Sequence, residues 1–418
     1  MHAFRALRIR PFALLWAGQT VSRIGDFVYE VVLAWWVLQE TGSAVAMGSV
    51  LIVTFVPVAV LTLLGGAVVD RVRRVPVLLA SDAVRGAAVL AVAALAAGDR
   101  LELWMVFALS LVFGVADAFF QPAYFALVPE LVPEEDLPSA NALTSMSFQL
   151  GRVAGPALGG IIVAGAGVGP GFVINGLSFL ASGLLLVPLL AGSRAPQRVA
   201  DEAGEGVLAR LVADTREGVA TVRGDPVLWI GIAAGSLIGA LLVGPFLVSM
   251  PFLVKERFGD DPRMLGYILA MFPVGFILGS LWGGRRTELP RRGLLAYGGM
   301  VAAGLMLAVF GLPLAPAALG TTTVLAVLAA AAVVNGFGLE LAGLVWAHVM
   351  QTRVPADRLG RVASLDQLLA WGATPVAFAA AGVATERFGP GPVFLVGGCA
   401  AALVALTALA HPAIRGLD

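Results

Sequence analysis

Four polar side chains interrupt the first long apolar stretch of the chain, residues 12–38. Gln19, Arg23, Asp26 and Glu30 fall within about 60° of one another when this stretch is drawn as a helix. A charged group at the centre of a bilayer costs roughly 3 kcal/mol, so such groups face water, a ligand or partner charges. The spacing therefore predicts a helix that lines a polar cavity, with Gln19 as a ligand-binding residue.

A second polar face follows in residues 101–128, where Asp117, Gln121 and Tyr124 are spaced by four and three. Residues at this spacing share one side of a helix. Gln121 and Tyr124 are expected to bind substrate, and the neighbouring Phe120 is a candidate wall of a lipophilic pocket.

The acids on these two faces are the candidates for proton transfer. If the faces meet, Asp26, Glu30 and Asp117 become neighbours, and one carboxyl group takes up a proton on one side of the membrane and releases it on the other. Arg23 then supplies a positive charge. The alternative is that Arg23 and Asp26 form a structural pair within one helix turn, which leaves Glu30 as an uncompensated acid.

The composition places these helices in a membrane. Of the 418 residues, 59% are hydrophobic and only 13% are charged, whereas soluble domains have about 25% charged residues. The net charge is zero, which gives no basis for a nucleic-acid partner. Stretches of spanning length predict an all-α integral membrane protein with twelve transmembrane helices, at 12–38, 44–69, 76–97, 101–128, 138–166, 170–191, 226–254, 263–284, 293–313, 317–350, 359–385 and 390–410.

The spans divide into two sets of six. Residues 1–191 form one predicted six-helix bundle, 192–225 a cytoplasmic linker with an amphipathic helix, and 226–418 the second bundle. Residues 132–137 and 354–359 both read Val-Pro-x-x-x-Leu before the fifth span of their half, and such repeats suit a transporter that rocks about a midplane site. Most of the 27 Lys and Arg residues fall in segments that are cytoplasmic if both termini are inside.

Residues 151–160 carry a pattern of small residues within the fifth span. Gly151, Gly155 and Gly159 are spaced by four and predict a smooth groove that another helix can approach closely. Pro156 removes one helix hydrogen bond and favours a bend. With Gly160, the stretch reads G-x-x-x-G-P-x-x-G-G.

This pattern, together with residues 66–78, makes the chain resemble the major facilitator superfamily, whose antiporters carry the former signature. Residues 66–78 match that superfamily's cytoplasmic motif G-x-x-x-D-R-x-G-R-[RK] at Gly66, Asp70, Arg71 and Arg74. In the family this loop holds the cytoplasmic ends of the two halves together. Asp82 and Arg85, one turn apart, are expected to extend the same network.

The resemblance implies a fold of two pseudo-symmetric six-helix bundles in which the first, fourth, seventh and tenth spans surround the cavity. In the second half, Glu340 and Asn335 are candidate substrate-binding residues; they lie about 140° apart on a helix, so at most one faces the cavity squarely. Many drug/proton antiporters of the family have an arginine in the fourth span, where this chain has Asp117.

Within the superfamily, the chain is most similar to exporters of the macrolide-efflux and siderophore-export type. The supporting residues are Gln19-x-x-Ser22-x-x-Gly25-Asp26, Thr41-Gly42-Ser43, Gln121-Pro122-Ala123 and Leu127-Val128-Pro129-Glu130. The expected function is export of an amphipathic or lipophilic small molecule in exchange for protons, by a monomer in the bacterial inner membrane with both termini cytoplasmic. The alternatives are a lipid or lysolipid transporter of the same fold without proton coupling, and a non-transporting membrane receptor or assembly partner.

Enzyme activity is not expected. The sequence has no phosphate-binding G-x-x-x-x-G-K-[ST] and no His, Cys and acid cluster with metal-ligand spacing. The predicted partners are therefore a lipophilic substrate, protons and the bilayer, with no cofactor and no metal.

Overall fold

A computed structural model describes residues 2–69, 71–192, 207–286 and 288–417, and all regular structure in these residues is helical. Two compact units emerge from the pattern of contacts: unit 1 comprises described residues of 1–200 and 260–270, and unit 2 those of 201–259 and 271–418. Asp70, a residue of the predicted cytoplasmic motif, lies outside the described residues.

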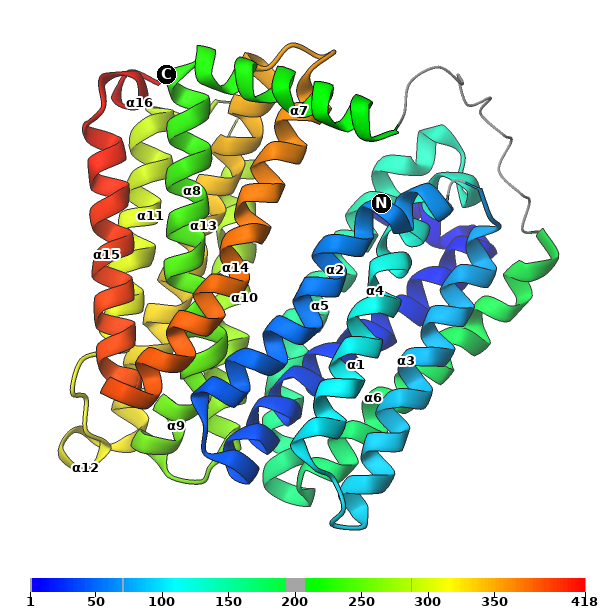
Figure 1. The fold of residues 1–418 in the computed structure, drawn as a ribbon, viewed down its shortest axis with the longest axis vertical. Helices are drawn as coiled ribbons and strands as arrows, with labels where there is room; N and C mark the ends of the chain where they lie inside the picture. The colour runs from blue at the N-terminus through cyan, green and yellow to red at the C-terminus, as the bar shows by residue number, and fades with distance from the viewer. Residues whose placement is uncertain (1, 70, 193–206, 287, 418) are drawn as a thin grey trace. The chain divides into compact units, whose positions relative to one another are not determined.

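Unit 1 is built mainly from six long helices that run side by side (Figure 1). The elements of this half are η1 (His2–Arg8), α1 (Arg10–Thr41), α2 (Ala44–Val69), α3 (Arg74–Ala97), α4 (Leu103–Leu131), η2 (Glu134–Asp136), α5 (Leu137–Ala166), α6 (Val168–Leu186) and η3 (Val187–Gly192). α1 packs against α5 and α6, α2 packs against α4, and α3 packs against α4 and α6. α1 is thereby inside the unit, with partners on two sides.

Local sequence explains where α1 begins and ends. Pro11 occupies the first turn, where its fixed φ suits a helix and its missing N–H is not needed. Gly42 follows the last residue with φ 59°, and its N–H bonds to the Leu38 carbonyl. A left-handed residue at this position is strained for any side chain but tolerated by glycine.

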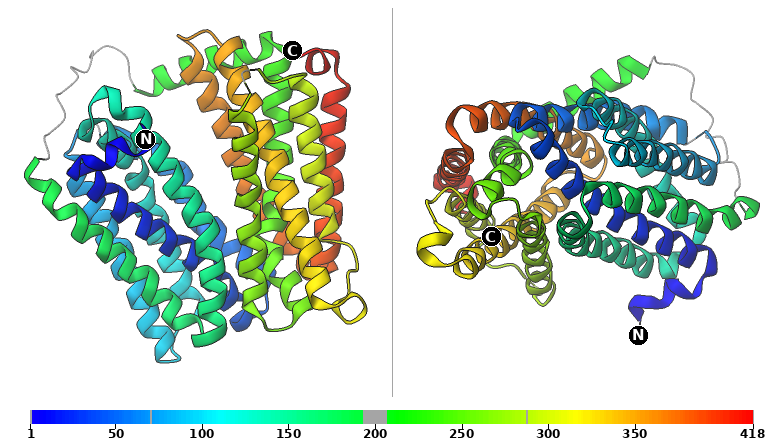
Figure 2. Two further views of the ribbon diagram at one scale, coloured as in Figure 1. Left: turned by 180° about the vertical axis from the view of Figure 1, so that it is seen from behind. Right: turned by 90° about the horizontal axis from the view of Figure 1, so that it is seen from below.

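Unit 2 repeats the helical plan. From residue 207 onward the elements are α7 (Val207–Gly224), α8 (Pro226–Gly244), the π-helical turn η4 (Pro245–Ser249), α9 (Met250–Phe258), α10 (Pro262–Gly284), α11 (Arg292–Val309), α12 (Pro316–Leu319), α13 (Thr321–Arg353), α14 (Leu359–Phe388), α15 (Pro390–Ala410) and α16 (Pro412–Arg415). The boundary between the units falls within α10, whose residues 262–270 belong to unit 1. α11 packs against α13 and α15, and α8 packs against α14 and α15 (Figure 2). The predicted seventh span, 226–254, is therefore a helix that widens at η4 and continues into α9.

The described part of the linker forms α7, which runs across the ends of the unit 2 helices (Figure 1). Glu217 on α7 forms ion pairs with Arg358, at 3.2 Å, and with Arg361, at 2.5 Å. Asp225 caps α8 by accepting from the Val227 N–H at 2.8 Å. These contacts fix the amphipathic helix to α14 and to the start of α8.

Eleven described helices are long and apolar enough to cross a membrane. α1, with 32 residues, is longer than the roughly 20 that a span needs but is not among these eleven. The polar stripe lowers its mean hydropathy, and α1 supplies the twelfth helix of spanning length. The fold is thus the predicted all-α, multi-pass membrane arrangement.

Candidate functional site

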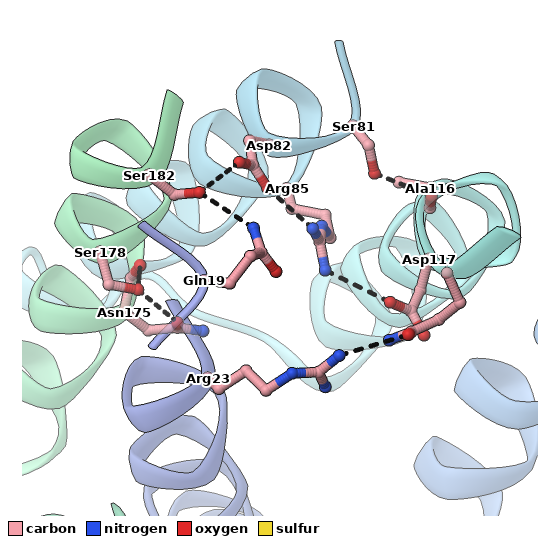
Figure 3. A network of polar contacts seen from close by, with 11 residues as sticks. Gln19, Arg23, Ser81, Asp82, Arg85, Ala116, Asp117, Asn175, Ser178 and Ser182 are labelled. Atoms are coloured by element: carbon pink, nitrogen blue, oxygen red, sulfur yellow. Dashed lines mark hydrogen bonds and ion pairs between the residues drawn. The ribbon is translucent and has the colours of Figure 1, made fainter. Parts of the chain in front are cut away.

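A buried arginine on α3 lies between two carboxylates. The Arg85 guanidinium donates to Asp82 Oδ1 at 2.8 Å and to Asp117 Oδ1 on α4 at 3.3 Å. The Arg85 and Asp82 side chains are 2% and 1% exposed, and Asp117 is 24% exposed. One cation is thus shared by two acids, one of them sealed in the unit and the other partly accessible (Figure 3).

Aromatic rings enclose the same guanidinium. Its central carbon lies 4.2 Å from the Phe120 ring centre, 4.6 Å from that of Phe179 and 5.6 Å from that of Phe113. A cation above aromatic faces is attracted to them most strongly when both are withdrawn from water. The rings therefore help to compensate the desolvation of Arg85.

A chain of hydrogen bonds connects this cation to α1 and α6. Ser182 donates to Asp82 Oδ2 at 2.8 Å, and the Gln19 amide donates to Ser182 Oγ at 3.2 Å. Gln19 and Ser182 are both buried. The predicted ligand residue Gln19 is thus linked through Ser182 to Asp82, the partner of Arg85, and α1, α3, α4 and α6 meet at one polar centre (Figure 3).

Arg23 and Asp26 on α1 are not a structural pair, contrary to the alternative prediction. Arg23 donates to Gln121 Oε1 at 3.3 Å and lies 5.0 Å from the Phe148 ring centre. Asp26 Oδ1 is buried without a hydrogen-bond partner among the described residues. The charges of Arg85, Asp117, Arg23 and Asp82 all act on Asp26, so this acid belongs electrostatically to the same centre.

We refer to Asp26, Asp82, Arg85 and Asp117 as the Arg85 cluster. Glu30 is electrostatically coupled to Asp26 but is exposed on the surface of unit 1. It is therefore placed one turn beyond the cluster rather than inside it.

The glycines of α5 set the position of α1 beside the cluster. A Cβ atom on Gly155 would lie 2.3 Å from Phe27 Cβ, and one on Gly151 would lie 2.9 Å from the Phe27 ring. A Cβ on Gly159 would lie 3.0 Å from the Val28 carbonyl oxygen. Pro156 and Gly160 are buried in the same helix. The small-residue face of α5 therefore receives the part of α1 that carries Arg23 and Asp26.

Two predicted substrate residues lie in the core of unit 1. Tyr124 and Phe120 are 1% and 2% exposed and stack with ring centres 6.3 Å apart. The Tyr124 hydroxyl is within 3.2 Å of Thr144 Oγ1. Both rings are closed off by neighbouring helices, because the face of α4 that they share with Gln121 turns towards α3 and α5.

The predicted gate residues separate into two groups. Arg74 begins α3 and forms an ion pair with Glu130 near the end of α4, whereas Arg71 is exposed and Gly66 is half-buried. Asp82 and Arg85 lie two to three turns deeper on α3, in the Arg85 cluster. They were expected to extend the loop network, and the structure instead joins them to Asp117.

The second-half candidates make separate contacts in unit 2. Glu340 accepts from Ser280 on α10 at 2.5 Å, and Asn335 donates to the Ala303 carbonyl on α11 at 2.7 Å. Asn335 is 3% exposed and joins two helices within the bundle. As predicted, the two side chains lie on different sides of α13, because one contacts α10 and the other contacts α11.

Sequence reasoning missed two partnerships. It assigned the positive charge beside Asp117 to Arg23, but Arg85 provides it. Asp366 on α14 accepts from the Trp346 indole N–H at 2.8 Å within unit 2, a pairing that the sequence analysis did not identify. The Asp82 and Arg85 spacing within an otherwise apolar span was the available signal for the first, because an intramembrane ion pair is rare without a function.

The Arg85 cluster is suited to moving charge rather than to covalent catalysis. The residues that the structure describes contain no group of three or more His, Cys, Asp or Glu side chains placed to hold a metal ion. Three carboxylates and one guanidinium can rearrange their pairing, and a proton or a ligand cation can enter the set as an additional positive charge.

Known proteins share this architecture. The model of the Major Facilitator Superfamily matches residues 15–379. Multidrug efflux pump Tap of Mycolicibacterium fortuitum is 28% identical over 98% of this chain and 97% of its own, and macrolide efflux protein A of Streptococcus pyogenes is 23% identical over 97% of each. A crystal structure of a bacterial homologue of the iron transporter ferroportin in an inward-facing state has TM-score 0.72 and 19% identity, covering 96% of this chain and 99% of that one.

Proposed function

Because the chain belongs to the Major Facilitator Superfamily, we propose that it is a secondary transporter that exports an amphipathic or lipophilic small molecule in exchange for protons. The efflux proteins to which it is similar over nearly their whole length support the direction of transport and the class of cargo. A carboxylate-rich, aromatic site suits cationic or neutral compounds better than anions.

The Arg85 cluster is the observation that carries the proposal. Asp82 and Asp117 bind a single guanidinium, and Asp26 Oδ1 is buried with no hydrogen-bond partner in the described chain. Uncompensated acids in a low-dielectric interior are costly. A proton on one of the three acids relieves the excess negative charge, and its departure restores that excess.

The cycle follows from this charge balance. When the site opens to the side where protons are abundant, Asp26 or Asp117 takes up a proton and releases its hold on a bound cation or dipole. When the site opens to the other side, the proton leaves and the acid again attracts substrate. Arg85 remains between Asp82 and Asp117 and prevents the unprotonated acids from repelling one another.

The remaining parts of the proposal concern placement. Residues 1–191 and 226–418 act as the two moving bundles. Gly66, Asp70, Arg71 and Arg74 contribute to closing one end, and Glu340 contributes to substrate binding from the second bundle.

The protein lies in a bacterial cell membrane with both termini cytoplasmic and works as a monomer. Fusion of a cytoplasm-dependent fluorescent reporter to the C-terminus tests the orientation, because only an inside terminus gives fluorescence.

The deciding experiment is exchange by purified protein in liposomes with ethidium as the transported probe. An imposed pH gradient should accelerate wild-type ethidium transport, and Asp26→Asn should transport at the same slow rate with or without the gradient. Glu40→Gln, an exposed acid on the same helix, is the matched control and should respond like wild type. A full response to the gradient in Asp26→Asn, Asp117→Asn and the double variant would place proton exchange elsewhere.

A further inference from the structure

A cavity of about 300 Å³ lies inside unit 2, among α8, α11, α13, α14 and α16. Its walls are mostly Gly, Ala, Val and Leu side chains, and Asp366 is its single charged lining residue. Small-molecule sites are typically apolar cavities of at least this size with a few convergent polar groups. None of the residues of the Arg85 cluster takes part in it.

The polar groups of this cavity are incompletely satisfied. Asp366 Oδ2 accepts from the Trp346 indole at 2.8 Å, and within the described residues no basic side chain forms an ion pair with Asp366. A carboxylate has about four acceptor positions, so one indole bond leaves most of them unused. The Ser236 hydroxyl, also in the wall, is buried without a hydrogen-bond partner among the described residues.

The backbone holds this cavity open on two sides. Gly235 on α8 and Gly343 on α13 line it, and a Cβ atom on either would meet nothing within 4 Å. By contrast, a Cβ on Gly231 would lie 2.3 Å from the Trp346 ring. The indole is therefore seated firmly against α8 while the space beside it stays empty of side chains.

We propose that this cavity is a binding site for a lipophilic amine, with the ammonium group on Asp366 and the apolar body against Trp346 and Tyr297. An anion is disfavoured by the carboxylate, and a purely apolar ligand leaves the carboxylate without a cation. An ammonium group satisfies the free carboxylate oxygen, and its rings or chains cover the apolar wall.

This inference concerns unit 2 alone and does not depend on proton exchange at the Arg85 cluster. It predicts ligand binding that persists whether or not transport is coupled to protons. Binding to purified protein without a gradient tests it separately from the proposed function.

The test uses two probes of the same shape, 1-naphthylmethylamine, which is cationic at pH 7, and 1-naphthylmethanol, which is neutral. Equilibrium dialysis against the protein in phosphatidylcholine nanodiscs, with empty nanodiscs subtracted, gives the affinity of each. The wild type should bind the amine at least tenfold more tightly than the alcohol. Asp366→Asn, which preserves the side-chain shape, should weaken the amine about tenfold and change the alcohol less than twofold.

A second part of the test fills the cavity with larger side chains. Gly235→Leu and Gly343→Leu should each abolish saturable binding of both probes, and the two variants guard against a folding defect in either one. Gly239→Leu is the matched control, because Gly239 is one turn along the same helix, is also open to a Cβ, and does not line the cavity; it should bind like wild type. Equal affinity of the wild type for amine and alcohol, or retained amine binding in Asp366→Asn or in both folded leucine variants, would overturn the proposal.

Discussion

The two units bury acids in different ways. Unit 1 surrounds an internal cation, Arg85, with Asp82 and Asp117 at 2.8 and 3.3 Å. Two acids in the long helices of unit 2 have neutral partners instead, Trp346 for Asp366 and Ser280 for Glu340. A carboxylate with only neutral donors retains a net negative charge, whereas one beside a guanidinium does not.

This difference determines where the positive charge that balances the acids comes from in each unit. In unit 1 an internal guanidinium already lies between two of the acids, so a single proton changes the balance among existing partners. In unit 2 the charge of Asp366 is uncompensated within the described residues, so the cation has to be a ligand. Two halves with the same helical plan are thus suited to different tasks. Substituting one partner of an acid at a time tests this difference.

The largest effect is expected from Arg85→Gln. The change leaves the buried Asp82 and the partly accessible Asp117 without their cation, and breaking a buried pair in this way typically costs about 3–5 kcal/mol. Detergent or thermal unfolding of the purified protein measures the loss. The double variant Asp82→Asn with Arg85→Gln should recover part of it, because the sealed acid is then neutral.

Arg100→Gln serves as the control for this series. Arg100 is exposed at the loop after α3, and surface substitutions usually stay within about 0.5 kcal/mol. Similar stability of Arg85→Gln and Arg100→Gln would remove the distinction between the two units.

The second effect concerns the contact that positions α1. Gly155→Ala introduces a Cβ that would lie 2.3 Å from Phe27 Cβ, and such overpacking costs about 1–3 kcal/mol. Gly165→Ala, near the end of the same helix, meets nothing within 4 Å and should be neutral or slightly stabilising. Unfolding midpoints of the two variants compare them directly, and equal midpoints would mean that α5 does not hold α1 by close approach.

Much of the architecture was predictable from the sequence because span length and helical periodicity are local properties. Residues 12–38 and 138–166 correspond to α1 and α5, extended by a few residues at their ends. The glycine pattern at 151–159 likewise predicted a close helix contact. The predicted tenth span, 317–350, corresponds to α13, which begins at Thr321 and continues to Arg353. Its first predicted residues belong to the separate short helix α12, which ends at Leu319.

The partners within the site were less predictable. Periodicity shows that Asp117, Gln121 and Tyr124 share a face, but it does not show which helix that face meets. Arg85 reaches Asp117 from α3, and Ser182 reaches Asp82 across a sequence separation of 100 residues. These pairings depend on tertiary packing, which one helix at a time cannot reveal. The same limit explains why Asp366 was not connected with Trp346.

The third prediction separates packing from substrate binding in unit 2. Asn335→Ala removes the bond to the Ala303 carbonyl, and losing one buried hydrogen bond costs about 1 kcal/mol. Because Asn335 is 3% exposed, its loss should lower the unfolding midpoint and leave the affinity for ethidium within twofold of wild type. Glu340→Gln provides the comparison, since Glu340 is more accessible and is the residue proposed to bind substrate. A larger loss of ethidium affinity in Asn335→Ala than in Glu340→Gln would instead assign substrate binding to Asn335.

The smallest effect is expected at an exposed ion pair at the start of α10, where Asp261 lies just before the helix and Arg263 lies in its first turn. Asp261 accepts from Arg263 Nε and Nη2, each at 2.8 Å, and these hydrogen bonds hold the pKa of the Asp261 carboxyl below its usual value. A lowered folded-state pKa stabilises the protein above the unfolded-state pKa of about 3.9 and loses that contribution as the pH falls through the folded-state value. The Arg263 side chain is 53% exposed, so water and salt screen the pair.

Asp261→Asn should therefore shift the thermal midpoint at pH 7 by an amount barely resolved from zero, and the small difference from wild type should vanish as the pH falls through the lowered folded-state pKa of Asp261. The pair has the same chemical groups as Asp82 and Arg85, but it is exposed, whereas Arg85 is buried and also bonds to a second acid, Asp117. A midpoint loss at pH 7 as large as that of Arg85→Gln would show that burial is not what distinguishes the two pairs. A loss that instead grew as the pH fell would contradict the direction of the Asp261 shift, because protonation removes the charge on which this pair depends.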